Sequence, residues 1–90
     1  MRITIANTTF DRVHYDSGAD VLYLSAGDPD GAVDFDESIE GHHLRFDEEG
    51  RLVGITIVRP RWLLDNQGQI AITIPERITL GADAVAPALV

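Results

Sequence analysis

Two carboxylates and two phenols gather in one short stretch of the sequence, HYDSGADVLYLS. Asp16 and Asp20 bracket a Ser-Gly-Ala loop, and Tyr15 and Tyr23 lie on either side of it. Paired carboxylates can serve acid–base or metal chemistry, but Ca²⁺ takes about six to eight oxygen ligands and a glycosidase pair needs a sugar cleft. In a second interpretation the aspartates accept hydrogen bonds from loop N–H groups and define a hairpin turn. We favour the structural turn, with the tyrosines packing an apolar ring and keeping a polar tip near the edge.

Three histidines, His14, His42 and His43, raise the question of a metal site. Adjacent side chains on a β-strand point to opposite faces, so His42 and His43 are not expected to share one ion. His14 would join one of them only if its strand lay alongside. With no cysteine and no serine in a nucleophile motif, we predict no metal site, no cofactor and no catalytic residue.

A basic and aromatic cluster, RPRW, stands out in a chain dominated by carboxylates. It supplies Arg59, Arg61 and Trp62, and arginine and tryptophan are among the residue types most enriched at binding hot spots. Two interpretations remain open. Either Trp62 closes one end of the core while the arginines pair with carboxylates, or the cluster contacts a partner. In the second interpretation it joins Tyr15 and Tyr23 as the predicted interaction residues.

Alternation of apolar and polar residues with period two predicts the strands that must position these side chains. Residues 21–24 are apolar on both faces, which is typical of a central strand covered on both sides. In AVDFDE, we expect Val33 and Phe35 to face inward, and Asp34 and Asp36 to face solvent and discourage edge pairing. The other sets expected to share a face are Ile3 and Ile5; Val13 and Tyr15; His42, Leu44 and Phe46; Val53, Ile55 and Ile57; and Ile70, Ile72 and Ile74.

Turn residues separate these runs. DPDG (28–31) combines a proline with a glycine, and DEEG (47–50) ends in Gly50, which suits a hairpin with a left-handed glycine. Pro60 is expected to open a short helix, since proline is favoured at the first helical position, and the segment LGADAVAPALV is expected to form a terminal helix. The predicted fold is α+β and mainly β: an antiparallel meander sheet of about five to six strands with one or two short helical elements.

The length and charge of the chain limit its class. Ninety residues predict a single domain that buries only about 60–65% of its unfolded surface, which favours a homodimer. The net charge of −8 disfavours nucleic acid and favours a basic protein partner. No apolar run is long enough to span a membrane, and MRITIANTTF lacks the apolar core of a secretory signal. A cytoplasmic protein is the expectation.

Two spaced motifs stand in the middle of the chain. The first is Tyr15-Asp16 followed by Asp20-Val21-Leu22-Tyr23, and the second lies in FDEEGRLVGITIV, with Asp47, Gly50, Val53, Gly54, Ile55 and Ile57. Together they resemble the domain of unknown function DUF2283. The resemblance covers residues 13–62 and leaves 63–90 as a C-terminal extension. It implies no enzymatic activity and no catalytic residue, and some relatives are thought to be antitoxin-like partners of small toxins.

Three functions therefore stay open. The favoured one is a non-catalytic interaction module of an antitoxin-like kind, which binds a basic partner by charge and strand addition. The second is a small-molecule-binding protein or minor enzyme with a site lined by Tyr15, Tyr23 and His42. The third is DNA binding through residues 68–85, which loosely resemble AbrB-type swapped-hairpin transcription factors but contain only Arg77 as a basic residue.

Overall fold

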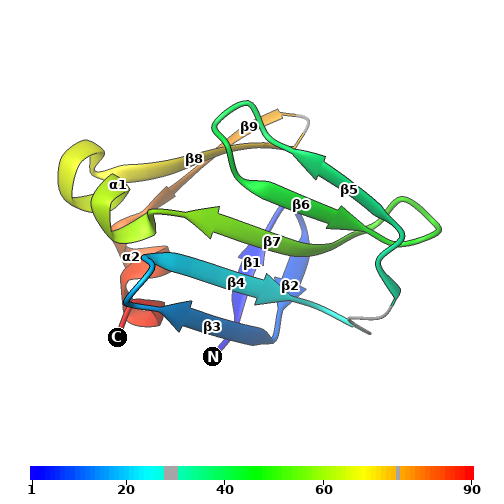
Figure 1. The fold of residues 1–90 in the computed structure, drawn as a ribbon, viewed down its shortest axis with the longest axis horizontal. Coiled ribbons are helices and arrows are strands. Elements are labelled where there is room, and N and C mark those ends of the chain that lie inside the picture. Colours follow the sequence, from blue (N-terminus) through cyan, green and yellow to red (C-terminus); the bar gives the residue numbers. More distant parts are fainter. Residues whose placement is uncertain (28–30, 75) are drawn as a thin grey trace.

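The computed structural model of the chain describes residues 1–27, 31–74 and 76–90, with the backbone alone for 76 and 77 (Figure 1). Except for Gly31, the predicted DPDG turn lies outside these residues, as does the side chain of Arg77. The strands are β1 (Ile3–Ile5), β2 (Thr8–Phe10), β3 (Arg12–Asp16), β4 (Val21–Ser25), β5 (Asp34–Glu37), β6 (His43–Phe46), β7 (Leu52–Val58), β8 (Gln69–Ile74) and β9 (Glu76–Gly81); the helices are α1 (Pro60–Gln67), α2 (Ala82–Val85) and a 3-10 helix (Ala86–Ala88).

A five-stranded antiparallel sheet forms the centre of the fold, in the order β3-β4-β7-β6-β5. The predicted fold class is confirmed: the chain is mainly β, with an antiparallel sheet and short helices. The strand order departs from sequence order at one point, because β7 lies between β4 and β6 and so becomes the middle strand of the sheet.

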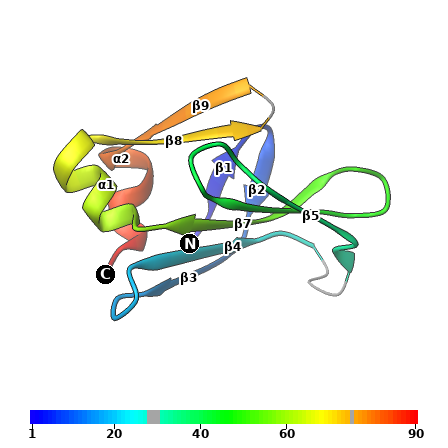
Figure 2. The same cartoon turned by 45° about the horizontal axis from the view of Figure 1, so that its top comes forward.

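One face of this sheet is covered by the rest of the chain. The β1–β2 and β8–β9 hairpins and α2 lie on the same side of the sheet (Figure 2). Among the described residues, no helix or strand lies over the opposite side, which faces the viewer in Figure 1; we call that side the open face. The core between the covered face and the hairpins consists of Ile3, Ile5, Phe10, Leu22, Leu24, Leu44, Leu52, Ile55, Ile57, Ile70, Ile72, Leu80, Val85, Ala88 and Leu89.

Strand β4 shows how alternation divides its residues between the two faces. Leu22 and Leu24 are fully buried in the core, whereas Tyr23 is 41% exposed on the open face. The expectation that β4 is covered on both sides is therefore not met within one chain. Burial within the chain therefore does not explain why β4 carries apolar residues on the open face.

The predicted orientation of β5 was wrong. Phe35 is 72% and Val33 49% exposed, and Phe35 pairs with Arg45 on the open face, while Asp36 pairs with the buried Leu44. Alternation identifies which residues share a face, but not which face meets the core. β5 is the edge strand, and the β1–β2 and β8–β9 hairpins that cover this side of the sheet do not extend as far as β5. All four residues of β5 are therefore exposed.

A β-bulge alters the predicted face of Val53. Arg45 pairs with Gly54 but Phe46 pairs with Leu52, so one residue of β7 is skipped. An extra residue in one strand shifts the alternation by one position. Leu52 is therefore buried together with Ile55, and Val53 is only partly buried. The other two members of the predicted set, Ile55 and Ile57, are fully buried as expected.

The expected short helices are present, although the C-terminal one is shorter than the predicted segment 80–90, because Leu80 and Gly81 belong to β9. Pro60 is the first residue of α1, and the C-terminal segment forms α2 and the 3-10 helix. Burial of Val85 (0% exposed) and Leu89 (2% exposed) fixes this segment against the core. In the part of the chain that the structure describes, no helix is long and apolar enough to cross a membrane.

Candidate interaction surfaces

The two aspartates of the opening loop have different partners. Asp16 accepts a hydrogen bond from the Ala19 N–H through Oδ1 (3.1 Å), which closes the turn between β3 and β4. Asp20 has a left-handed backbone (φ 54°) and accepts a hydrogen bond from the Tyr15 hydroxyl (2.9 Å). Tyr15 is partly buried against the core, so the Asp20 carboxylate lies at the margin of the core. The pair does not form a shared carboxylate site.

Asp20 also holds the beginning of α1, forty residues further along the chain. Its two carboxylate oxygens accept the backbone N–H groups of Arg61 (3.1 Å) and Trp62 (3.2 Å). The first N–H groups of a helix have no partner within it, and the helix's own N-cap residue, Arg59, makes no side-chain capping bond. The backbone N–H of Arg59 donates to the Asp20 carbonyl (2.8 Å). Asp20 therefore caps α1 from a distant loop.

These contacts shift two pKa values. Partial burial raises the pKa of Asp20, but the hydrogen bonds from Arg61, Tyr15 and Trp62 outweigh it and hold the pKa below its usual range. The pKa of Tyr15 is raised by burial and by its bond to Asp20. The hydroxyl therefore stays protonated and acts as a donor, which is a structural role.

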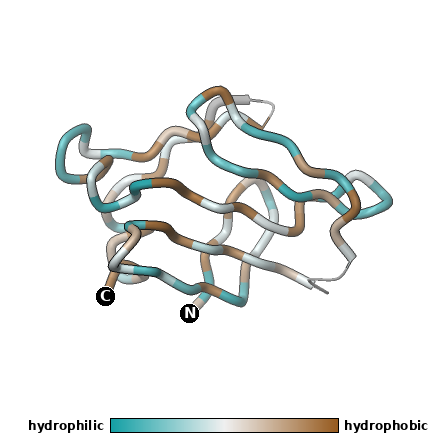
Figure 3. The backbone as a smooth tube through the Cα atoms, viewed as in Figure 1, coloured by the Kyte–Doolittle hydropathy of each residue, from teal (hydrophilic) through white to brown (hydrophobic). Residues whose placement is uncertain are grey.

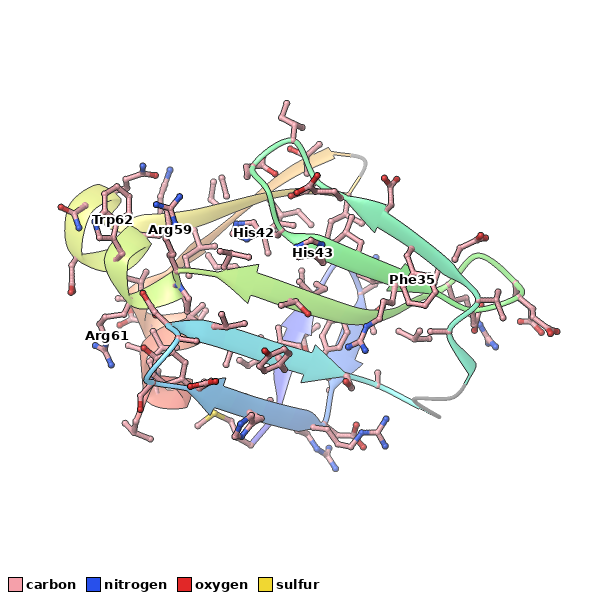
Figure 4. All side chains as sticks on the ribbon, viewed as in Figure 1. Phe35, His42, His43, Arg59, Arg61 and Trp62 are labelled. Carbon is pink, nitrogen blue, oxygen red and sulfur yellow. The ribbon has the colours of Figure 1, made fainter. Side chains whose placement is uncertain are left out.

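The RPRW cluster divides into a structural and an exposed part. Arg61 donates a hydrogen bond to the Leu89 carbonyl and so ties the C-terminal segment to α1. Arg59 lies over the Trp62 ring, with its guanidinium carbon 5.2 Å from the ring centroid, and Trp62 is 45% exposed. Figure 4 shows Arg59 and Trp62 together at the α1 end of the molecule. Their interaction role stays a prediction.

The structure does not bring Tyr15, Tyr23 and His42 together. Tyr15 pairs with the buried Leu22 and points to the covered side, whereas Tyr23 lies on the open face. Since the two tyrosines are on opposite faces, they cannot line one ligand site with His42, which is 2% exposed. The site of Tyr15, Tyr23 and His42 that the small-molecule hypothesis named is therefore not assembled.

His42 and His43 point in opposite directions, as predicted. His42 is buried, and its Nδ1 accepts the Val58 N–H (3.1 Å), while His43 is exposed on the open face (Figure 4). Beside His42, Glu40 accepts hydrogen bonds from the Thr73 hydroxyl (2.6 Å) and N–H (2.9 Å), joining the β5–β6 turn to β8. Within the described residues, no three histidine, aspartate or glutamate side chains are placed to hold a metal ion.

The open face brings together side chains that the sequence analysis considered separately, namely Tyr23 as a predicted interaction residue and His14 and His43 as metal-site candidates. Tyr23 pairs with His14, and their rings stack with centroids 6.1 Å apart and planes 19° apart. Phe35 and His43 come from the other side of β7 (Figure 4). The residues that define the open face are Arg12, His14, Asp16, Val21, Tyr23, Ser25, Phe35, Glu37, His43, Arg45, Gly54, Thr56 and Val58.

Gly54 gives one arginine its place on this face. A Cβ added at Gly54 would lie 2.4 Å from Arg45 Nε and 2.6 Å from Nη2, so the guanidinium occupies the space that a side chain on β7 would fill. Arg45 Nη2 reaches across β7 to Ser25 Oγ on β4 (3.4 Å). The Gly54 of the V-G-I motif therefore has a packing role that the motif alone does not disclose.

Gly54→Ala tests this packing. We expect Gly54 and Arg45 to be coupled by about 1 kcal/mol or more, as neighbouring residues commonly are. Gly54→Ala should destabilise the chain with Arg45 present. It should be neutral or stabilising in an Arg45→Ala background, because alanine in a strand is about 0.5–1 kcal/mol better than glycine once the space is empty. Urea unfolding of the two single variants and the double variant measures the coupling, and additive effects would exclude it.

Strand β5 and the adjacent turn between β6 and β7 form an acidic edge. Val33 and Phe35 are exposed among carboxylates there, and the turn at 47–50 is hydrophilic (Figure 3). Arg51 lies at this end and pairs with Asp47 (3.0 Å) and Glu49 (2.9 Å). Gly50 of the turn has the left-handed φ of 78°. The carboxylates that define the acidic edge are Asp34, Asp36, Glu37, Glu48 and Glu49.

The segment with the AbrB-like pattern, residues 68–85, contributes to the hydrophobic core of its own chain. Residues 69–81 form the β8–β9 hairpin, paired in register from Gln69 opposite Gly81. Ile70 and Ile72 are 0% exposed and Leu80 is 7% exposed. The apolar side chains of the hairpin therefore stabilise the monomer.

The fold places the chain in the class of small, mainly β domains with an antiparallel sheet and short helices. A family comparison matches residues 12–59 to DUF2283, a protein family of unknown function. The match covers more than half of the chain, and the chain belongs to this family. Neither a search of curated proteins nor a search of solved structures found a match.

Proposed function

We propose that this chain is a non-catalytic, cytoplasmic interaction module, antitoxin-like in kind, that binds a basic protein partner at the acidic edge. The observation that carries the proposal is the combination found on β5. This strand is the last of its sheet, and no described strand pairs with its outer edge, the free edge. Phe35 is 72% exposed between Asp34 and Asp36. Soluble domains rarely leave an aromatic ring this exposed on an edge strand without a partner for it.

The backbone of β5 supports strand addition. The Ser38 N–H donates to the His42 carbonyl (2.7 Å), so Ser38 faces β6 with its hydrogen-bonding groups. Alternation then directs the N–H and C=O of Phe35 and Glu37 toward the free edge. The Glu37 N–H is taken by Asp36 Oδ1 (2.8 Å), which leaves Phe35 as the position where an incoming strand would pair.

The charge of the edge supports a basic partner. The chain has a net charge of −8, and a partner strand with arginine or lysine at alternate positions would meet Asp34 and Asp36 on one face and Glu37 on the other. Opposite charges of this kind raise the association rate and weaken with salt, because surface pairs are screened within about 10 Å at 0.1 M ionic strength.

The test is capture of the partner with matched charge variants. Tagged wild-type protein, Asp34→Lys/Asp36→Lys and the control Asp11→Lys/Asp65→Lys are incubated at low salt with lysate of the organism that encodes the chain. Both variants change the net charge equally, but the control residues are exposed and lie outside β5. We expect wild type and control to retain one basic protein in stoichiometric amount, released by salt, and the β5 variant to bind it at least tenfold more weakly.

Two outcomes would contradict the proposal. One is the recovery of no basic partner by wild-type protein. The other is equal loss of binding in both variants, since this would show that net charge, and not the acidic edge, attracts the partner.

A further inference from the structure

The open face presents apolar and aromatic surface that the chain itself does not cover. Tyr23 is 41% exposed, and Val21 and Val58 are only partly buried, with no described helix or strand over them. Yet the face is not uniformly apolar, because it also carries arginines, histidines and carboxylates. The positions of those charges relative to the middle strand determine which partner fits.

The pairing registers arrange the open face in rows across the sheet. One row runs from His14 through Tyr23, Thr56 and His43 to Glu37. The next row runs from Arg12 through Ser25, Gly54 and Arg45 to Phe35. In both rows the middle residue lies on β7, with two strands on each side of it.

We propose that the open face binds a second copy of this chain, with the twofold axis running parallel to β7. Such an axis places β4 over β6 of the second copy and β3 over its β5. Thr56 and Gly54 then lie near the axis, opposite themselves. A twofold interface uses the same surface on both chains, so every contact away from the axis occurs twice.

The first row becomes self-complementary in this arrangement. His14 meets the Glu37 carboxylate of the second copy, an acceptor for an imidazole N–H. Tyr23 meets His43 of the second copy, and both are flat rings with a polar group at the rim. Two packed sheets lie about 10 Å apart with interdigitating side chains, a spacing that these residues span.

The second row matches as well. Arg12 meets the exposed Phe35 ring of the second copy, an arrangement suited to a cation–π contact within about 6 Å. Arg45 lies over Gly54 and already reaches Ser25 of its own chain (3.4 Å), so this row contributes the contact of Arg12 with Phe35. With the axis across the strands instead, His14 would face its own copy and Glu37 would have no histidine partner. The pairing of donors with acceptors, together with the Arg12–Phe35 contact, therefore selects the axis along β7.

The experiment is a charge reversal followed by its restoration, measured by sedimentation equilibrium of the full chain at pH 7. We expect wild type to dimerise, and His14→Glu to raise the dimer Kd at least tenfold, because the new carboxylate would face that of Glu37. Adding Glu37→Arg to His14→Glu should return the Kd to within about threefold of wild type, since opposite charges face each other again. Circular dichroism of each variant checks that the monomer stays folded, and Asp65→Lys on α1 serves as a surface control expected to leave the Kd unchanged.

Three results would overturn this interface. The first is sedimentation of wild type only as monomer at about 100 μM, a concentration at which even a weak specific dimer with a Kd of about 10 μM is mostly formed. The second is an unchanged Kd for His14→Glu, which would place the interface elsewhere. The third is failure of the second substitution to restore association, which would exclude the axis along β7. Phe35 and Glu37 belong to both the open face and the acidic edge. His14→Glu changes only the open face and Asp34→Lys/Asp36→Lys changes only the acidic edge, so one proposal can fail without the other.

Discussion

Replacing His42 by alanine is expected to lower the free energy of unfolding by about 3 kcal/mol, within the range of large-to-small changes in a core. His42 is 2% exposed, and its Nδ1 accepts the Val58 N–H (3.1 Å). The ring therefore fills space between β7 and β8 and also satisfies a partly buried backbone donor. Alanine would leave a cavity and, with it, an unpaired N–H, which costs about 1–3 kcal/mol by itself.

The neighbouring histidine is the matched control for this prediction. His43→Ala removes the same side chain one position later, but from the exposed open face. We expect its effect on unfolding to stay within about 0.5 kcal/mol, as for most surface substitutions. Urea denaturation of both variants at pH 7 and at a concentration that keeps the chain monomeric measures the difference. Equal effects would show that the burial of His42 contributes nothing.

Burial also gives His42 a defined pH dependence. Desolvation lowers the pKa of the imidazole, despite the opposite influence of Glu40 and of a hydrogen bond to the Ala71 backbone, and His43 and Arg59 lower it further. The unfolded chain takes up the proton near pH 6.5, before the folded chain does. The stability contributed by neutral His42 is therefore present above about pH 6.5 and is lost as the pH falls through the folded pKa. His42→Ala should remove this part of the pH dependence.

His42 and His43 show what a sequence pattern can and cannot predict. Alternation placed them on opposite faces, because side chains of adjacent strand residues always diverge. The same rule applied to β5 named the right pairs but assigned them to the wrong faces. Inward and outward depend on where the hairpins lie, and β5 extends beyond them. The alternation of residues along one strand carries no information about how far the hairpins reach across the sheet.

The strand order and the Asp20 contacts were beyond prediction for a related reason. Nothing in the sequence indicates that β7 pairs with β4, although the resulting register builds both rows of the open face. Likewise, Asp20 was expected to bond within its own turn, and Asp16 does so. The carboxylate oxygens of Asp20 face α1 only because β4 begins beside the end of β7, where Val21 pairs with Val58. Two features of the sequence nevertheless pointed to these contacts. Gly54 interrupts an apolar strand, which indicates that a neighbouring group packs closely against it. Arg59 before Pro60 is not a capping residue, which indicates that the cap of α1 comes from elsewhere.

The second large effect is expected at Asp20. Asp20→Ala should lower the free energy of unfolding by about 2–3 kcal/mol. Loss of a helix cap accounts for about 1 kcal/mol, and the lost Tyr15 bond contributes about another 1 kcal/mol. Alanine is also less tolerant than aspartate of the left-handed φ of 54° found here. Asp20→Asn keeps that tolerance and one acceptor oxygen, so about half of the loss is expected.

Asp16→Ala is the control, because it removes a carboxylate from the other end of the same loop with a single turn bond. We expect an effect of about 1 kcal/mol or less, in line with one exposed hydrogen bond. Thermal and urea unfolding of the three variants would rank Asp20→Ala below Asp20→Asn and Asp16→Ala. If Asp16→Ala lowered the free energy of unfolding as much as Asp20→Ala, the loop would stabilise the chain through its own turn and not through the cap on α1.

The pH dependence separates the charge of Asp20 from its shape. Although burial acts in the opposite direction, the hydrogen bonds from Arg61, Tyr15 and Trp62 keep the folded pKa below the usual value, so the unfolded chain binds the proton first as the pH falls. The stabilisation is complete above about pH 4, near the pKa of a free aspartate, and is lost as the pH decreases through the folded pKa. The gap in stability between wild type and Asp20→Asn should therefore be constant from about pH 5 to 7 and narrow below about pH 4. A gap independent of pH would show that Asp20 caps α1 equally well without its charge.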